Sequence, residues 1–138
     1  MAQYQQQGGI PCSPNSTVTA ALANQRYAVR LDPATATDTN ANPTVALTQA
    51  TADEDEVFGE YQTHDSGTVL VRNVGVVVLR ASAAYSAAVN GQGVRSSATA
   101  GVVSAAGLEN GVGRIIGGGT ESIGGSDVNV YRVLLGTR

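Results

Sequence analysis

The stretch that decides the fold class is residues 67–81, which read GTVLVRNVGVVVLRA. Eight of these fifteen residues are valine or leucine, and such branched side chains favour β-strands because they pack well on a pleated surface. Both alternate faces are apolar, so we expect one central strand over Gly67–Ala81, covered on both sides by a packed layer or by a neighbouring subunit. Gly75 predicts a bulge, a bend or a close backbone approach. One face carries Val69, Val71, Val77 and Leu79, and the other carries Leu70, Val74, Val76 and Val78.

Shorter apolar alternations, separated by turn residues, predict further strands. In one of them we expect Tyr27, Val29 and Leu31 to point inward, with Ala28 and Arg30 pointing outward. Residues 117–125 are predicted to be a glycine-rich loop. Several short strands with frequent turns favour an all-β fold, a small sandwich or barrel, over a βαβ fold. The other predicted strands are Thr44–Thr48, the hairpin of Val94–Ser96 with Val102–Ala105, Val112–Ile116 and Val128–Leu135.

The composition limits the classes of partner. A chain of 138 residues supports one domain, and eight arginines against eleven acidic residues, without any lysine, give a net charge of −3. A chain with this weak negative charge lacks the excess of basic residues that binds a phosphate backbone, so nucleic-acid binding is not expected. The first nine residues lack the basic and apolar regions of a signal peptide, and no apolar run approaches the roughly 20 residues of a membrane span. The single cysteine, Cys12, excludes an intrachain disulfide.

Residues 1–24 differ in character from the rest of the chain. They contain three consecutive glutamines, a pair of glycines and two prolines, and they show neither a helical nor a strand period. We therefore expect an extended N-terminal arm over residues 1–24, ordered only against a partner, followed by a β-rich domain over residues 25–138. The candidate contacts of the arm are its few apolar side chains, Tyr4, Ile10, Val18 and Leu22.

Residues of catalytic type are few. His64, the only histidine, is followed directly by Asp65 and Ser66. A Ser-His-Asp site needs side chains that converge in space, whereas neighbours along an extended segment diverge. We therefore expect a solvated turn over His64–Gly67. A pair between Cys12 and His64 has no support beyond the residue types.

Two segments resemble ligand sites only superficially. The acidic run Asp53–Glu56 lacks the glycine and carbonyl spacing of a calcium loop, and Thr51–Glu54 fits a capping box at a solvated helix start. Gly111–Gly117 has the look of a dinucleotide loop, but β-branched residues follow where a helix should begin, and no lysine completes a P-loop. We expect no metal, no cofactor and no enzymatic activity.

From Val57 onward the order of these signals resembles a family of small capsid decoration (cement) proteins of tailed phages. Members carry a short apolar-glycine element, an acid-to-glycine turn, a valine-rich strand with a glycine, a small-residue stretch leading to a hairpin, a glycine-flanked strand and a terminal VRVLL-like strand. The resemblance spans Val57–Arg138. The corresponding segments here are Val57–Gly59, Ser66–Gly67, Val69–Leu79, Tyr85–Val94, Gly101–Ala105, Gly113–Gly117 and Tyr131–Leu135.

The resemblance implies a structural protein on the outer surface of the capsid of a phage virion. It implies binding to the major capsid protein, stabilisation of the icosahedral head and self-association as a homotrimer. The alternative is a glycan- or receptor-binding β-module of a phage fibre or surface protein. The absence of tryptophan and the single phenylalanine disfavour that alternative, because glycan sites usually display aromatic platforms.

Overall fold

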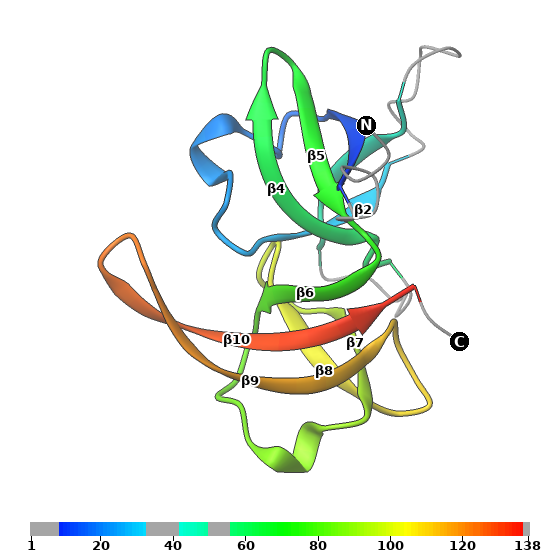
Figure 1. The fold of residues 1–138 in the computed structure, drawn as a ribbon, viewed down its shortest axis with the longest axis vertical. Coiled ribbons are helices and arrows are strands. Elements are labelled where there is room, and N and C mark those ends of the chain that lie inside the picture. The colour runs from blue at the N-terminus through cyan, green and yellow to red at the C-terminus, as the bar shows by residue number, and fades with distance from the viewer. Residues whose placement is uncertain (1–8, 33–41, 50–55, 137–138) are drawn as a thin grey trace.

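The computed structural model describes residues 9–32, 42–49 and 56–136, and their fold is all-β, as the sequence predicted. Figure 1 shows two β-units stacked along the long axis of the molecule. Within the described ranges the helical elements are the 3-10 turns η1 (Ala20–Leu22) and η3 (Ala87–Val89), and no helix there is long and apolar enough to cross a bilayer.

The first unit is a closed five-stranded barrel with the strand order β1-β3-β2-β4-β5. β1 closes the barrel because it pairs in parallel with β3 on one side and antiparallel with β5 on the other. The β4–β5 hairpin turns at Ser66 and Gly67, whose φ angles of 52° and 83° suit a two-residue hairpin turn. The strands are β1 (Gly9–Pro14), β2 (Ala28–Leu31), β3 (Thr44–Leu47), β4 (Gly59–Asp65) and β5 (Thr68–Arg72).

The second unit consists of two packed layers. A three-stranded antiparallel sheet has the order β6-β10-β9, and the β7–β8 hairpin lies behind it (Figure 1). β9 and β10 continue beyond β6 as a two-stranded ribbon that turns at Gly124 and Gly125. The strands are β6 (Gly75–Arg80), β7 (Gln92–Ser96), β8 (Val103–Leu108), β9 (Arg114–Ile123) and β10 (Ser126–Leu135).

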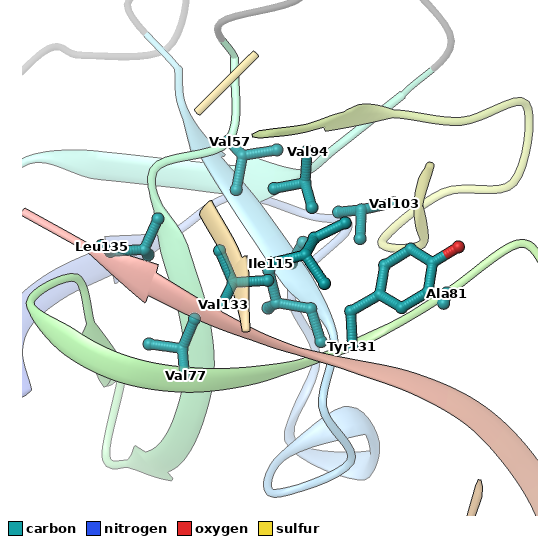
Figure 2. Close-up of a cluster of buried hydrophobic side chains, with 11 residues drawn as sticks. Val57, Val77, Ala81, Val94, Val103, Ile115, Tyr131, Val133 and Leu135 are labelled. Atoms are coloured by element: carbon teal, nitrogen blue, oxygen red, sulfur yellow. The ribbon is translucent and has the colours of Figure 1, made fainter. Parts of the chain in front are cut away.

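Each unit has its own hydrophobic core. The barrel core includes Tyr61 and Val69, and the core between the two layers of the second unit includes Val77 and Val133 (Figure 2). Adjacent residues of β2 divide between these cores, because Ala28 belongs to the second core and Val29 to the first. Side chains of a strand alternate between faces, so β2 forms part of the wall that the two units share.

The prediction of one continuous strand over Gly67–Ala81 is wrong. The run divides into β5 and β6, which lie in different units, and the chain turns between them. Gly75 stands at this turn with a φ of +84°, so the bend that it predicted is present. Each half keeps its own alternation, and the same predicted face is buried in both halves. Its members Val69, Val71, Val77 and Leu79 are all 0% exposed.

The opposite apolar face of this run is only partly covered within the described chain. Leu70 on β5 is 39% exposed, and Val74 in the turn is 52% exposed. Val76 and Val78 on β6 are half-buried. Among the described residues, the coverage expected on both sides is therefore complete on one side and partial on the other.

The predicted division at residue 24 does not hold for the part that the structure describes. Residues 9–14 form β1, and Cys12 (0% exposed) and Val18 (2% exposed) belong to the barrel core. Backbone pairing with β3 and β5 holds β1 in place, and such pairing requires no apolar alternation in the sequence. Residues 1–8 lie outside the described residues.

Two local predictions also need correction. Residues 117–123 are not a loop but the last seven residues of β9. A Cβ atom on Gly118 would lie 2.7 Å from Cδ1 of Tyr85, so only glycine fits beneath that ring. In β2, Val29 is buried as predicted, but Ala28 is also fully buried and Leu31 is 47% exposed, so the predicted alternation holds only in part. Ala28 is buried because β2 packs against both cores. The predicted hairpin (now β7–β8) and the predicted final strand (now β10) are confirmed.

We expect a variant without residues 1–24 to lose its cooperative fold, because it lacks the strand that closes the barrel. Burial of Val18 alone contributes about 1.5–3 kcal/mol. Thermal unfolding followed by circular dichroism tests this, with deletion of residues 1–8, which leaves β1 intact, as the control. A sharp, wild-type-like transition in the longer deletion would contradict the role of β1.

Candidate functional site

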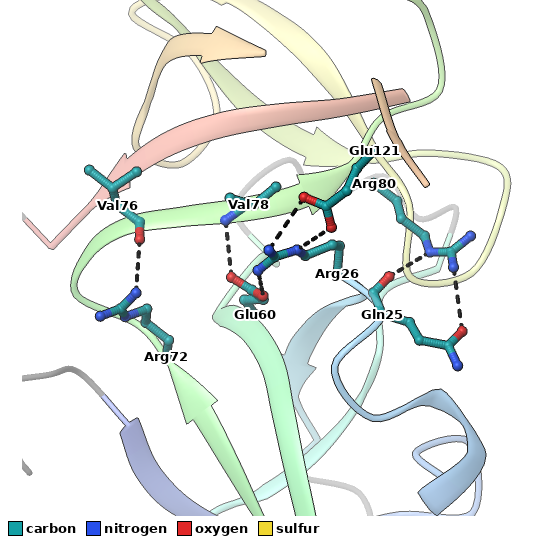
Figure 3. A network of polar contacts seen from close by, with 8 residues as sticks. All are labelled: Gln25, Arg26, Glu60, Arg72, Val76, Val78, Arg80 and Glu121. Atoms are coloured by element: carbon teal, nitrogen blue, oxygen red, sulfur yellow. Dashed lines mark hydrogen bonds and ion pairs between the residues drawn. The ribbon is translucent and has the colours of Figure 1, made fainter. Parts of the chain in front are cut away.

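A partly buried ion-pair network joins the two units. Glu60 of β4 is 2% exposed, and its Oε2 accepts a hydrogen bond of 3.0 Å from Nη1 of Arg26 in the loop before β2. Nε of Arg26 donates to Oε1 of Glu121 on β9 at 2.8 Å (Figure 3). Hydrogen bonding to Glu121 raises the pKa of Arg26, and Glu60 adds to this rise, against a lowering effect of burial. One guanidinium thus links a barrel strand to a strand of the sheet.

The same network satisfies the edge of β6 that does not pair with β10. Oε1 of Glu60 accepts the Val78 N–H at 3.0 Å, and the carbonyl oxygen of Arg26 accepts the Arg80 N–H at 2.8 Å. Nη1 of Arg72 donates to the carbonyl oxygen of Val76 at 3.4 Å (Figure 3). Unpaired backbone groups at a strand edge are costly when buried and invite aggregation when exposed. The barrel therefore protects this edge of the sheet.

Arg80 extends the network along the loop before β2. Its guanidinium carbon lies 4.2 Å from the centroid of the Tyr27 ring, and its Nε donates to the Gln25 carbonyl oxygen at 2.7 Å. The charged groups of the network thus form their ion pairs, hydrogen bonds and cation–π contact within this chain. We interpret the network as the joint between the units.

The predicted candidates for catalysis are not brought together. Cys12 and His64 both pair with Val69, from opposite sides, so two strand spacings, about 10 Å in all, separate their backbones. Burial raises the pKa of the Cys12 thiol to about 11, which leaves it protonated and unreactive near neutral pH. Oγ of Ser66 donates to the adjacent Asp65 at 3.2 Å, and this local pair does not form a triad. The turn predicted there is shorter than expected, because His64 and Asp65 belong to β4.

The segments that superficially resembled ligand sites have other roles where the structure describes them. Gly113 packs against β10, since a Cβ atom there would lie 2.7 Å from the Leu134 carbonyl oxygen, and a strand follows it instead of a helix. Residues 51–55, which include the predicted capping box and most of the acidic run, lie outside the described residues. In the described ranges, no group of three His, Cys, Asp or Glu side chains could hold a metal ion.

Three of the four predicted contact residues are described, and all three lie in the barrel unit. Val18 is buried in the barrel core, so it stabilises this chain and presents no surface to a partner. Ile10 and Leu22 pack against the same core and keep part of their surface exposed. Tyr4 lies outside the described residues.

An exposed apolar surface covers the front of the three-stranded sheet. On β6, Val76 and Val78 point away from the buried Val77, and Ile116 of β9 is 46% exposed beside the buried Ile115. We call the following residues the sheet face: Val74, Val76, Val78, Ile116 and Leu134, with the exposed Arg114 and Arg132.

A smaller exposed surface lies on the barrel. Leu70 of β5 pairs with Pro11 of β1 and with Thr63 of β4, and all three are exposed. Paired residues share a face of the sheet, so these side chains lie next to one another on the outside of the barrel. We call them the barrel face. Contiguous exposed apolar surface is typical of protein–protein contacts, so the two faces are the candidate functional sites.

We expect Glu60→Ala to destabilise the protein by about 3 kcal/mol, because it leaves the Val78 N–H and Nη1 of Arg26 without their acceptor. Chemical denaturation measures this loss. Glu121→Ala removes the more exposed partner of the same arginine and should cost about 1 kcal/mol or less. Equal losses for the two variants would show that Glu60 has no special role at the joint.

We expect Cys12 to resist alkylation in the folded protein. With a pKa of about 11, about one thiol in a thousand is deprotonated at pH 8, and the side chain is fully buried. Mass spectrometry after iodoacetamide treatment should show labelling only once denaturant unfolds the barrel. Rapid labelling without denaturant would contradict the position of β1.

No protein-family model matches the chain, and no match was found among curated proteins or among solved structures. The functional argument therefore rests on the residues and the geometry of this chain.

Proposed function

We propose that this chain is a structural decoration protein that binds the outer surface of an icosahedral phage head and stabilises the lattice of the major capsid protein. The observation that carries the proposal is the pair of exposed faces, one on each of two joined units. A protein that reinforces a lattice must contact more than one neighbour, and two separate faces suit that task. The order of sequence signals from Val57 onward supports a phage head as the assembly.

Modest contact faces are adequate for this role. A protein that binds only the assembled shell stabilises it by mass action, by about 2.7 kcal/mol per site at a free concentration 100-fold above the Kd. Self-association as a homotrimer would multiply the contacts, so that avidity adds to a weak individual contact. Neither effect requires a cofactor or a catalytic group.

A glycan- or receptor-binding module is the alternative, and it has less support. Tyr61 and Tyr131 are buried, at 0% and 2% exposure. The ring of Tyr27 lies under the Arg80 guanidinium, and Tyr85 packs edge-on against Tyr131. The described tyrosines thus serve packing within the chain rather than an open aromatic platform for a sugar ring.

We expect Leu70→Asp to weaken binding to phage heads by about tenfold or more, because it would bury an unpaired carboxylate in the contact. Cosedimentation with heads assembled without this protein measures the effect. Ser126→Asp is the matched control, because it adds the same charge at the exposed first residue of β10, outside both faces.

Two results would contradict the proposal at different levels. Failure of the wild-type chain to cosediment with heads at micromolar concentration would refute the capsid role. Equal binding by Leu70→Asp and Ser126→Asp would show that the barrel face is not the contact with the head.

A further inference from the structure

We propose that the sheet face binds a second copy of this chain, and that the turn carrying Leu108 and Glu109 is the part of the second copy that occupies it. The inference rests on the self-association proposed above and names the surfaces that make it. It does not depend on binding to a capsid.

The sheet face combines exposed apolar surface with uncompensated positive charge. Val74 is 52% exposed and Ile116 46% exposed. Within the described ranges, neither Arg114 nor Arg132 forms an ion pair. Glu121, the acidic residue of β9, is held by Arg26. On a chain with a net charge of −3, this face is locally basic, so it favours an acidic occupant with apolar side chains.

The turn between β8 and β9 has the complementary chemistry. Leu108 is 67% exposed, more than any other large apolar side chain of the described residues. Glu109 follows it, also exposed, and forms no ion pair within the described ranges. The turn is packed closely against β7, since a Cβ atom on Gly111 would lie 2.6 Å from the carbonyl oxygen of Val94. An anchor that is already ordered loses little conformational entropy on binding.

The contact must form between copies. Leu108 ends β8, which lies behind the three-stranded sheet, whereas the sheet face is its front (Figure 1). In a contact between copies, Leu108 of one copy packs on Ile116 of the next, and its Glu109 approaches Arg132, which pairs with Gly117 beside Ile116. The two surfaces differ, so the contact is head-to-tail, and such contacts close into rings when the rotation between copies permits. A homotrimer is the closed ring that we propose.

Charge-reversal variants of the full-length chain test the proposed contact between Glu109 and Arg132. Sedimentation equilibrium without heads should show a wild-type oligomer, and Arg132→Glu and Glu109→Arg should each raise the dissociation constant about tenfold or more. The double variant E109R/R132E restores opposite charges across the contact and should associate like the wild type. Both residues are exposed and form no ion pair within the described chain, so circular dichroism should show that all three variants are folded.

A matched pair of leucine variants tests the proposed apolar contact of Leu108 with the sheet face. Leu108→Asp should abolish the oligomer, whereas Leu31→Asp, which changes a leucine 47% exposed on the barrel, should leave it intact. A monomeric wild type at tens of micromolar would overturn the inference. So would single reversals that associate like the wild type, a double variant that stays dissociated, or equal effects of the two leucine variants. An oligomer that responds as expected but does not bind heads would keep this inference and refute only the capsid role.

Discussion

The contact between Arg26 and Glu60 is the constraint on which the rest of the structure depends. Glu60 is almost fully buried, and a buried carboxylate is tolerated only when its oxygens are taken up by donors. Its two oxygens bind donors on different elements, Arg26 beside β2 and the backbone of Val78 on β6. Removal of either donor would leave charge or hydrogen-bonding capacity unsatisfied, so the relative position of barrel and sheet is closely specified. This joint therefore also sets the orientation of the two exposed faces relative to each other.

Alternation along the central run predicted which side chains are buried, but not how the run is divided. The pattern Val69, Val71, Val77, Leu79 identified the buried face correctly on both sides of Gly75. A period of two says only that alternate residues share a face, and it carries no information about which sheet the face belongs to. Gly75 indicated a bend, yet the assignment of its two sides to separate units depends on pairing partners far away in the sequence, which a local pattern does not contain.

The joint itself was beyond local sequence reasoning. Arg26 lies 34 residues from Glu60 and 95 from Glu121, and nothing in the spacing of isolated charges links them. One signal was present, because Glu60 interrupts the otherwise apolar and small segment from Val57 to Tyr61, where an acid needs a partner. Val18 was misplaced for a related reason, because closure of a barrel by β1 is a property of the whole sheet and not of the polar segment that contributes the strand.

The apolar outer residues of β6 are unusual for a sheet that has one face in water. An antiparallel sheet with one face in water normally alternates apolar and polar residues, and polar side chains at Val76 and Val78 would leave the buried face of β6 unchanged. The chain instead carries valine there, with leucine opposite on β10 and isoleucine on β9. Exposed apolar surface of this kind lowers solubility unless something covers it. Within the described chain this surface is only partly covered, and the two arginines beside it form no ion pair there. The self-association that we propose would complete the coverage on both sides that the sequence pattern first suggested.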